Sequence, residues 1–255
     1  MIKEAALEYL IYNSKIYSVE KADIDADTEK DSIYEVIRII DGVPLYLEEH
    51  LNRLRKSAEL IDLKIDKTDR ELINEMKKLI EINNLNNLNI KILCSGDEKS
   101  IKDIYLYFIK SFYPPKSMYE EGIDTMLYKT ERENPNAKTF NGQLRQTINV
   151  QLKERNAFEA LLVDHNDQIT EGSRSNVFFV KDKSLYTSPA NKVLLGVTRT
   201  KIMELSRLNN IDIIEKEIAL SDLSKYDGAF ITGTSTGVLP IKNIDKIEIS
   251  SPKND

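Results

Sequence analysis

Lys138 stands where a lysine amine could do chemistry, in the segment Ala137–Asn141 between a polar loop and the start of an expected helix. A lysine amine becomes a nucleophile for carbonyl compounds when burial or nearby positive charge lowers its pKa. The spacing alone describes an exposed loop lysine equally well, because most lysines lie on the surface. Lys138 is therefore a candidate nucleophile for an aldehyde or ketone. Other residues of the sequence are needed to support or exclude this role.

A dense polar cluster, Ile169–Asn176, leads directly into the apolar strand Val177–Val180. It combines hydroxyl, carboxylate, guanidinium and amide groups, which is more than a simple hairpin turn requires. Because loops that join strands often carry functional side chains, this cluster is a candidate binding or catalytic segment.

Two glycine-containing segments have the composition of anion-binding or turn elements. Gly196 precedes an expected helix, and the unbonded N–H groups of a first helical turn bind anions, phosphate above all. Thr198 could instead simply cap that helix. The segment Ile231–Gly237 runs from a strand into hydroxyls and glycines, a pattern that a tight turn would also give. Neither segment by itself identifies a ligand.

The elements that must position these residues form an α+β pattern. Strands are expected at 7–12, 15–19, 33–40 and 43–47, and Asp41–Gly42 is expected to turn a hairpin. Helices are expected over 47–61 and from Thr68, where Glu71 completes a capping box. Further strands are expected at 90–94 and 104–112, before prolines that stop sheet pairing. We place a domain boundary there, which gives domains 1–114 and 119–255.

The second half is expected to carry a strand at 125–128, a helix over 141–155 and then short strands in series. A helix from Thr198 to Leu208 is expected before the last strands. The expected strands of this half are 159–164, 176–180, 185–187, 211–214, 229–232 and 238–242.

Composition excludes several classes of protein. The 255 residues have a formal net charge of -6 and no separate run of Lys and Arg, so nucleic acid is not an expected partner. No apolar run or export signal is visible, which predicts a cytoplasmic protein that does not bind a membrane. Cys94 is the only cysteine and is expected to be buried in a strand. His50 and His165 lack metal-ligand partners at helical spacing, so no metal site is expected.

Taken in this order, the segments resemble the class IV aminotransferases. These are the fold-type IV pyridoxal-phosphate enzymes, which include branched-chain and D-amino-acid aminotransferases and aminodeoxychorismate lyase. The most specific match is Thr170–Asn176. The resemblance also rests on Ser32–Gly42, Glu49–Leu54, Lys138, Gly196–Arg199 and Thr232–Thr234. It implies a two-domain α+β fold with pyridoxal 5'-phosphate at the domain interface, and a homodimer.

The same resemblance assigns roles to residues. Lys138 would hold the cofactor as a Schiff base and, once substrate displaces it, would carry a proton at the substrate's α-carbon. Glu171 would face the pyridine nitrogen and keep it protonated. The phosphate would be held by charge-assisted hydrogen bonds and by a helix N-terminus. The further residues expected to bind the cofactor are Arg53, Asn176, Val197, Thr198 and Thr234.

The substrate side of the site is less well specified. Tyr34, Arg38 and Ser235 are expected to bind substrate, although Tyr34 and Arg38 could be ordinary residues of a sheet face. Gly142 and Gly237 stand where many relatives have larger or charged side chains. The strand 105–111 lacks the arginine that often binds a substrate carboxylate. Lys110 is the candidate to replace it, although an ammonium lacks the bidentate fork of a guanidinium.

The expected activity is amino transfer between a small amino acid and a 2-keto acid, similar to that of branched-chain aminotransferases. An aminodeoxychorismate lyase, which eliminates pyruvate with the same cofactor, remains an alternative. A non-catalytic relative that only binds the cofactor is a third, although it would need neither Lys138 nor Glu171.

Overall fold

The computed structural model describes residues 4–20, 31–97, 99–139 and 141–249 and divides into two compact units. The first unit contains the described residues up to Phe112 and also residues 137–139. The second contains Tyr113–Asn136 and the chain from Asn141 onward. Compact units defined by contacts need not fold independently, so the expected domains 1–114 and 119–255 stay a prediction.

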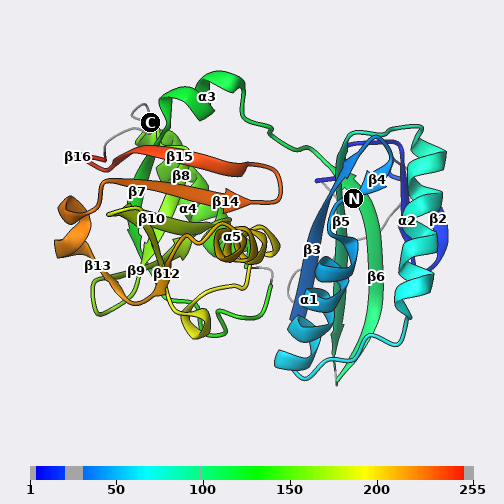
Figure 1. The fold of residues 1–255 in the computed structure, drawn as a ribbon. Helices are drawn as coiled ribbons and strands as arrows, with labels where there is room; N and C mark the ends of the chain where they lie inside the picture. Colours follow the sequence, from blue (N-terminus) through cyan, green and yellow to red (C-terminus); the bar gives the residue numbers. More distant parts are fainter. Residues whose placement is uncertain (1–3, 21–30, 98, 140, 250–255) are drawn as a thin grey trace. The chain divides into compact units, whose positions relative to one another are not determined.

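The first unit is built on a six-stranded antiparallel sheet with the order β2-β1-β6-β5-β3-β4. Figure 1 shows its strands in blue and green. At the β3–β4 hairpin, Asp41 and Gly42 have φ of 50° and 78°, as a turn of type I′ requires. The strands are β1 (Tyr9–Tyr12), β2 (Lys15–Ser18), β3 (Asp31–Ile40), β4 (Val43–Pro44), β5 (Leu88–Asp97) and β6 (Ser100–Ile109).

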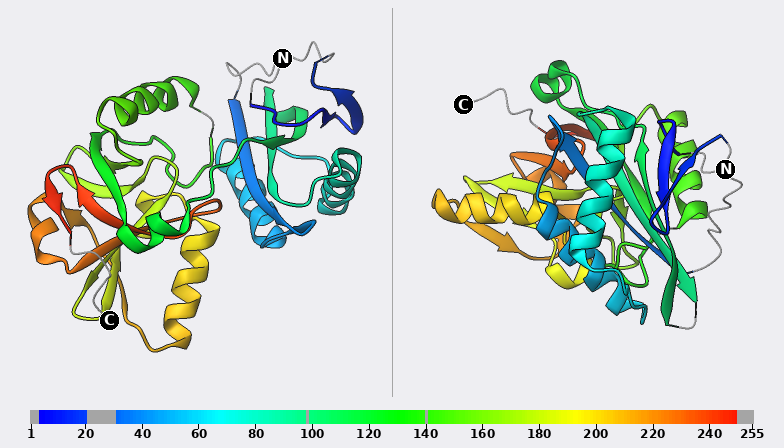
Figure 2. Two further views of the ribbon diagram at one scale, coloured as in Figure 1. Left: turned by 90° about the horizontal axis from the view of Figure 1, so that it is seen from above. Right: turned by 90° about the vertical axis from the view of Figure 1, so that its right-hand side faces the viewer.

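Two helices, α1 (Leu47–Leu60) and α2 (Asp69–Asn83), pack on one face of this sheet (Figure 2). The apolar residues of both helices recur at helical spacing and meet alternate residues of the strands. The capping box between Thr68 and Glu71 is present at the start of α2. This face therefore forms the core of the first unit. Its strand residues include Ile33, Ile37, Ile90, Ile92, Cys94, Leu106 and Phe108.

The opposite face of the sheet is lined with tyrosines. Tyr12 stacks on Tyr105, with ring centroids 4.7 Å apart and an interplanar angle of 14°. The Tyr12 hydroxyl donates to Asp103 Oδ1 at 2.7 Å. Tyr34 and Tyr107 belong to the same cluster, together with Leu10 and Leu93. Aromatic rings cover apolar area and still offer polar groups, so this face can hold charged side chains.

The second unit is built on a ten-stranded sheet that follows the order β12-β11-β10-β14-β15-β7-β8-β9-β13, with β16 paired to β15. Three pairs are parallel, namely β11–β12, β15–β7 and β7–β8. The strands are β7 (Ile123–Lys129), β8 (Glu159–Val163), β9 (Gln168–Gly172), β10 (Asn176–Lys181), β11 (Ser184–Thr187), β12 (Ile213–Glu215), β13 (Ile218–Ala219), β14 (Gly228–Gly233), β15 (Gly237–Ile244) and β16 (Ile247–Glu248).

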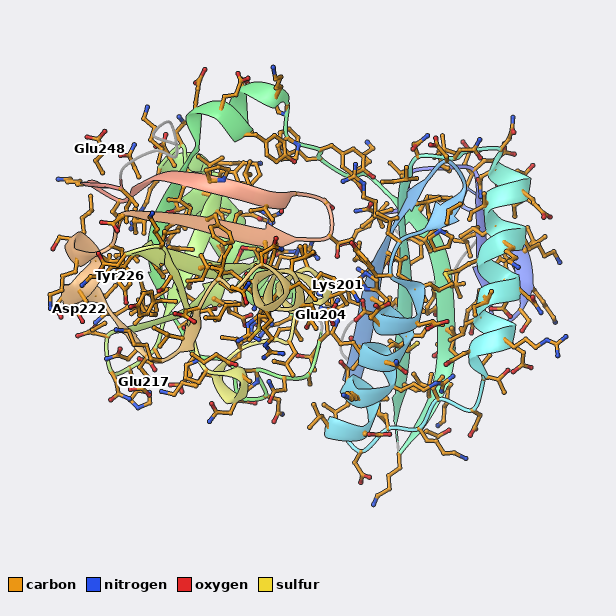
Figure 3. All side chains as sticks on the ribbon, viewed as in Figure 1. Lys201, Glu204, Glu217, Asp222, Tyr226 and Glu248 are labelled. Carbon is orange, nitrogen blue, oxygen red and sulfur yellow. The ribbon has the colours of Figure 1, made fainter. Side chains whose placement is uncertain are left out.

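The helices of the second unit are α3 (Lys116–Glu121), α4 (Gly142–Glu154) and α5 (Val197–Leu208), with 3₁₀ segments at Ala190–Lys192 and Leu220–Lys225. Ile148 and Leu152 of α4 pack on β7 and β8, on the side opposite the main core. In that main core, Tyr226, which is labelled in Figure 3, lies against Phe179 with ring centroids 4.9 Å apart.

Most expected elements are present, with differences at their ends. The strand expected at 43–47 is only Val43–Pro44, because α1 already begins at Leu47. The strand expected at 104–112 ends at Ile109, before the prolines. The elements α3, β9, β13 and β16 were not expected. β9 covers the first part of the polar cluster 169–176, and the other three are too short to carry much periodic signal. Within the described residues, none of the helices combines the length and apolarity needed to cross a bilayer.

The reactivity of Cys94 tests how tightly the core of the first unit is packed. Its side chain is fully buried on β5, as expected from the sequence, and burial raises the pKa of its thiol to about 12. The thiolate is the reactive form, so labelling requires opening of the sheet. We expect a thiol reagent to modify the native protein at least ~1000-fold more slowly than the unfolded chain, given ordinary domain stability. Labelling at equal rates in buffer and in denaturant would contradict this packing.

Candidate active site

Lys138 is held against the open edge of β3 by backbone contacts. Its N–H donates to Ser57 Oγ of α1 at 3.1 Å, and its carbonyl accepts from the Tyr34 N–H at 3.0 Å. The next residue, Thr139, forms an isolated bridge with Ile33. Residues 137–139 thus extend the sheet of the first unit, although they lie far along the chain from β3. The position of Lys138 is fixed by sheet pairing and by a helix hydroxyl.

The Lys138 amine lies over the ring of Tyr34, with Nζ 4.5 Å from the ring centroid. A cation over an aromatic face is attracted by the ring quadrupole. Tyr34 and Arg38 are both half-buried and project from the same face of β3, as period-two spacing requires. The first unit therefore brings together two residues that were expected at the site, Lys138 and Tyr34, and places Arg38 on the same face of β3.

Arg53 of α1 pairs with a buried carboxylate that the sequence analysis did not single out. Its Nε and one Nη donate to the two carboxylate oxygens of Glu35 at 2.6 and 2.8 Å. His50 Nδ1 lies 2.8 Å from Glu35 Oε2. A guanidinium has five N–H donors, and this pair uses two of them. The period-two pattern of β3 could have predicted that Glu35 is buried, because it places this residue among Ile33, Ile37 and Ile39 on the helix-covered face.

Two opposing effects act on the Glu35 carboxyl. Complete burial raises its pKa, and the Arg53 guanidinium with the His50 hydrogen bond lowers it more strongly, so that the pKa falls to about 2. Glu35 is consequently ionised at neutral pH. It holds the guanidinium of Arg53 in one orientation, which an exposed helix arginine would not have.

In the second unit, Glu171 on β9 is buried and held by three groups. Its Oε2 accepts from the Leu194 N–H at 3.1 Å and from Asn176 Nδ2 at 3.3 Å. Arg132 Nε lies 3.3 Å from Oε1. These contacts hold the Glu171 carboxylate in one orientation within the second unit.

Asn176 joins this carboxylate to the start of α5. Its Nδ2 also donates to the Leu194 carbonyl at 2.8 Å. A Cβ added at Gly196 would lie 2.1 Å from Asn176 Oδ1, so only glycine allows this close approach. Gly196 is the N-cap of α5 and no side chain caps it. The N–H groups of Val197 and Thr198 then belong to a helix N-terminus that is suited to bind an anion.

The turn between β14 and β15 carries the last two expected residues, Thr234 and Ser235, both half-buried. Thr232, at the end of β14, pairs with Asn176 across the sheet. Its hydroxyl is buried, and its Oγ1 has no hydrogen-bond partner among the described residues. Since buried hydroxyls are nearly always satisfied, this group indicates a missing partner in the region of Asn176.

A second carboxylate that the sequence analysis did not single out, Glu159, holds the loop between Glu171 and Asn176. It is buried on β8, and four neutral donors reach it. They are the Ser173 and Ser175 hydroxyls at 2.6 and 2.9 Å and the Arg174 and Ala160 N–H groups at 3.3 and 2.9 Å. The two hydroxyls in 173–175 were a signal in the sequence for such a residue, because buried hydroxyls need a hydrogen-bond acceptor. Glu159 fixes the loop that separates two expected site residues.

The expected residues thus form two groups. Lys138, Tyr34, Arg38 and Arg53 belong to the first unit, whereas Glu171, Asn176, Val197, Thr198, Thr234 and Ser235 belong to the second. Within 4–20, 31–97, 99–139 and 141–249, no cluster of three or more His, Cys, Asp or Glu side chains could hold a metal ion.

The Glu35–Arg53 pair predicts how stability depends on pH. The folded pKa of Glu35, about 2, lies below its ordinary value of 4.5. Its contribution is therefore fully present above about pH 4.5 and is lost as pH falls toward 2. We expect Glu35→Gln to lower the free energy of unfolding at pH 7 by about 3 kcal/mol and to flatten its dependence on pH in that window. Denaturant unfolding at several pH values measures both effects.

The exposed Glu59 on the same helix supplies the control, Glu59→Gln, which should follow the wild-type curve. Parallel curves for Glu35→Gln and wild type between pH 4.5 and 2 would show that Glu35 makes no such contribution.

Glu159 makes a separate prediction for the second unit. Glu159→Gln replaces one acceptor oxygen by an NH₂ group. This NH₂ donor would then face the hydroxyl and N–H donors that contact that oxygen in the wild type. We expect a loss of about 1–3 kcal/mol in stability, because buried donors lose their acceptor. Amide hydrogen exchange should also become faster at Ser173–Asn176. Glu154→Gln, an exposed change at the end of α4, is the control, and unchanged exchange in Glu159→Gln would argue against a positioning role.

Comparison with known proteins identifies the family of the chain. The family model for amino-transferase class IV matches residues 32–244. The chain is 28% identical to the D-alanine aminotransferase of Bacillus licheniformis, over 95% of this chain and 90% of that protein. It is 30% identical to a probable branched-chain-amino-acid aminotransferase of Rickettsia felis, over 87% of this chain and 79% of that protein.

The fold is also similar to a solved structure. The branched-chain amino acid aminotransferase of Escherichia coli superposes with a TM-score of 0.85 at 24% identity, covering 96% of this chain and 89% of that one. At this identity the likeness establishes the fold, and the match of the family model over most of the chain establishes the family. The expected two-domain α+β fold is thereby confirmed, and the chain belongs to the class IV aminotransferases.

Proposed function

We propose that this aminotransferase holds pyridoxal 5'-phosphate on Lys138 and moves amino groups between a small amino acid and a 2-keto acid. In substrate class it would be similar to the branched-chain enzymes. The D-alanine and branched-chain aminotransferases among its relatives support amino and keto acids as substrates. We further expect a homodimer in the cytoplasm.

One observation carries the proposal. Lys138 is fixed on both sides of its peptide unit, by Ser57 and by the Tyr34 N–H, while its amine lies against the Tyr34 ring. A surface lysine has no need of such anchoring, because its side chain is normally solvated and mobile. An amine that must reach one carbon atom repeatedly needs a fixed backbone and a defined direction.

The described residues fit the cofactor. A phosphate requires N–H donors and positive charge. In the second unit, the α5 N-terminus at Val197–Thr198 offers N–H donors, and in the first unit the Arg53 guanidinium offers positive charge. The Thr234 hydroxyl and the buried Thr232 hydroxyl offer further polar groups. We propose that both groups of residues serve one cofactor. When bound, pyridoxal 5'-phosphate acts as an electron sink for the carbanion at the substrate's α-carbon.

The protein residues would then divide the work. Lys138 would provide the amine that holds the cofactor and, once substrate releases it, would move a proton at the substrate's α-carbon. Glu171 would provide the negative charge that keeps the pyridine nitrogen protonated, and Asn176 and Arg132 contact that carboxylate. Tyr34, Arg38 and Ser235 would contact the substrate. A pyruvate-eliminating lyase would use the same groups, and the aminotransferase reading is preferred because the relatives named above are aminotransferases.

Lys138→Ala tests the central step. We expect wild-type protein mixed with pyridoxal 5'-phosphate to develop the absorbance of a protein-bound Schiff base, and the variant to lose it completely with unchanged far-ultraviolet circular dichroism. Added amino acid should convert the wild-type absorbance to that of the aminated cofactor, and a keto acid should restore it.

Lys116→Ala removes an exposed lysine of α3 and should behave as wild type. Retention of the Schiff-base absorbance by Lys138→Ala would overturn the role of Lys138. Release of pyruvate from aminodeoxychorismate without any amino acceptor would favour the lyase instead.

A further inference from the structure

Asn136 holds the point at which the chain leaves the second unit for the segment that contains Lys138. Its side-chain nitrogen, Nδ2, donates to two backbone carbonyls, that of Ala190 at 2.8 Å and that of Val193 at 2.6 Å. A side-chain amide has two N–H donors, so each carbonyl can receive one of them. The next residue, Ala137, already belongs to the first unit. Asn136 therefore anchors the chain directly before the Lys138 segment.

The turn that accepts these hydrogen bonds is held by other contacts as well. Its last carbonyl belongs to Val193, which is buried. The next residue, Leu194, has both backbone groups bonded to buried side chains. Its N–H donates to Glu171 at 3.1 Å, and its carbonyl accepts from Asn176 at 2.8 Å. The turn therefore has a position that does not depend on Asn136 alone, and it serves as a fixed reference for the chain that Asn136 ties to it.

Lys138 lies only two residues after Asn136. Two residues span at most about 7 Å, even when the chain is fully extended. A displacement of the Asn136 backbone is consequently passed on to Lys138 over a short length of chain. In the first unit, Ser57 and the Tyr34 N–H hold the Lys138 peptide groups. The backbone at Ala137 thus has an anchor in each unit, one on either side.

An amide side chain suits this place because both of its acceptors are carbonyl oxygens. An aspartate has nearly the same shape, but when ionised it has no donor and would set a negative charge against two carbonyl oxygens. Alanine removes the donors without adding this repulsion. Since Asn136 is half-buried, water can then reach the two carbonyls. The contact should therefore be weakened more by Asn136→Asp than by Asn136→Ala.

We propose that Asn136 is a positioning residue for the Lys138 amine. Its contact with Ala190 and Val193 sets where the amine lies with respect to the turn that bonds Glu171. It acts through the two residues of chain that lead to Lys138. The inference rests on the proposed function, since it takes Lys138 as the amine that binds the cofactor.

Two forms of the cofactor separate the position of the amine from the groups that bind the ring and the phosphate. Pyridoxal 5'-phosphate reacts with a lysine amine, whereas pyridoxamine 5'-phosphate has no aldehyde and cannot. We expect Asn136→Asp to slow the appearance of the Schiff-base absorbance at least about tenfold, and Asn136→Ala to slow it less, because misplacing a reacting group is costly. The affinity for pyridoxamine 5'-phosphate, measured by calorimetry, should stay within about threefold of wild type, because the turn remains in place.

Amide hydrogen exchange of the full chain gives a second readout that involves no reaction. In Asn136→Asp we expect exchange at least about tenfold faster at the N–H groups of Lys138 and Tyr34, while the Leu194 N–H keeps its protection. The matched control is Asn209→Asp. The exposed Asn209 amide likewise donates to a backbone carbonyl, that of Leu205 at 2.8 Å, at the end of α5. This control should behave as wild type in both measurements.

The proposal requires both changes. Wild-type rates of Schiff-base formation in Asn136→Asp and Asn136→Ala would overturn it, even if their melting temperatures fall, because Asn136 would then be merely structural. Slower formation with unchanged exchange at Lys138, or an equal loss of affinity for pyridoxamine 5'-phosphate, would also overturn it. Asn136→Ala answers the case in which Asn136→Asp does not fold. If wild type itself forms no Schiff base, the proposed function fails, and the exchange measurement still tests whether Asn136 fixes the Lys138 backbone.

Discussion

The position of Lys138 depends on one long-range backbone contact, the pairing of residues 137–139 with the edge of β3. Sheet edges have unpaired N–H and C=O groups, and here the Tyr34 N–H finds its acceptor in Lys138. The Ser57 hydroxyl of α1 completes the contact from the helix side. A segment that lies between two stretches of the second unit is thus bound to the first. The direction of the Lys138 side chain, and hence its place on the Tyr34 ring, follows from this backbone geometry.

The sheet of the first unit separates two kinds of charge by its period-two alternation. Glu35 projects to the helix-covered face, where Arg53 and His50 surround it. Tyr34, its neighbour in sequence, projects to the other face, toward Lys138 and Lys91. A shift of β3 by one residue would exchange these environments and would bury Tyr34 under α1. The register of β3 against β5, held over nine residue pairs, therefore keeps the Glu35–Arg53–His50 cluster and the contact between Tyr34 and Lys138 on opposite faces.

Local patterns in the sequence predicted much of this fold, but they could not predict contacts between residues that are far apart in the chain. The Asp41–Gly42 turn and the Thr68–Glu71 capping box are complete within a few residues and were predicted. The pairing of Lys138 with β3 joins residues about a hundred positions apart, so no periodicity reports it. Arg53 was singled out by family resemblance, but its bond to Glu35 was not. The roles of the expected site residues remain predictions.

The buried carboxylates Glu35, Glu159 and Glu171 are each stabilised differently, and the difference bears on what each can do. Glu35 has a guanidinium, so most of its charge is already compensated. Glu159 receives four neutral donors, which orient a loop without adding charge. Glu171 combines two neutral donors with an arginine nitrogen at 3.3 Å, longer than the closest contact of Glu35 at 2.6 Å. Among the three, Glu171 is the one proposed to face a ring nitrogen. Its donors from Leu194 and Asn176 hold in one orientation the carboxylate that this role requires, much as the donors to Glu159 orient a loop.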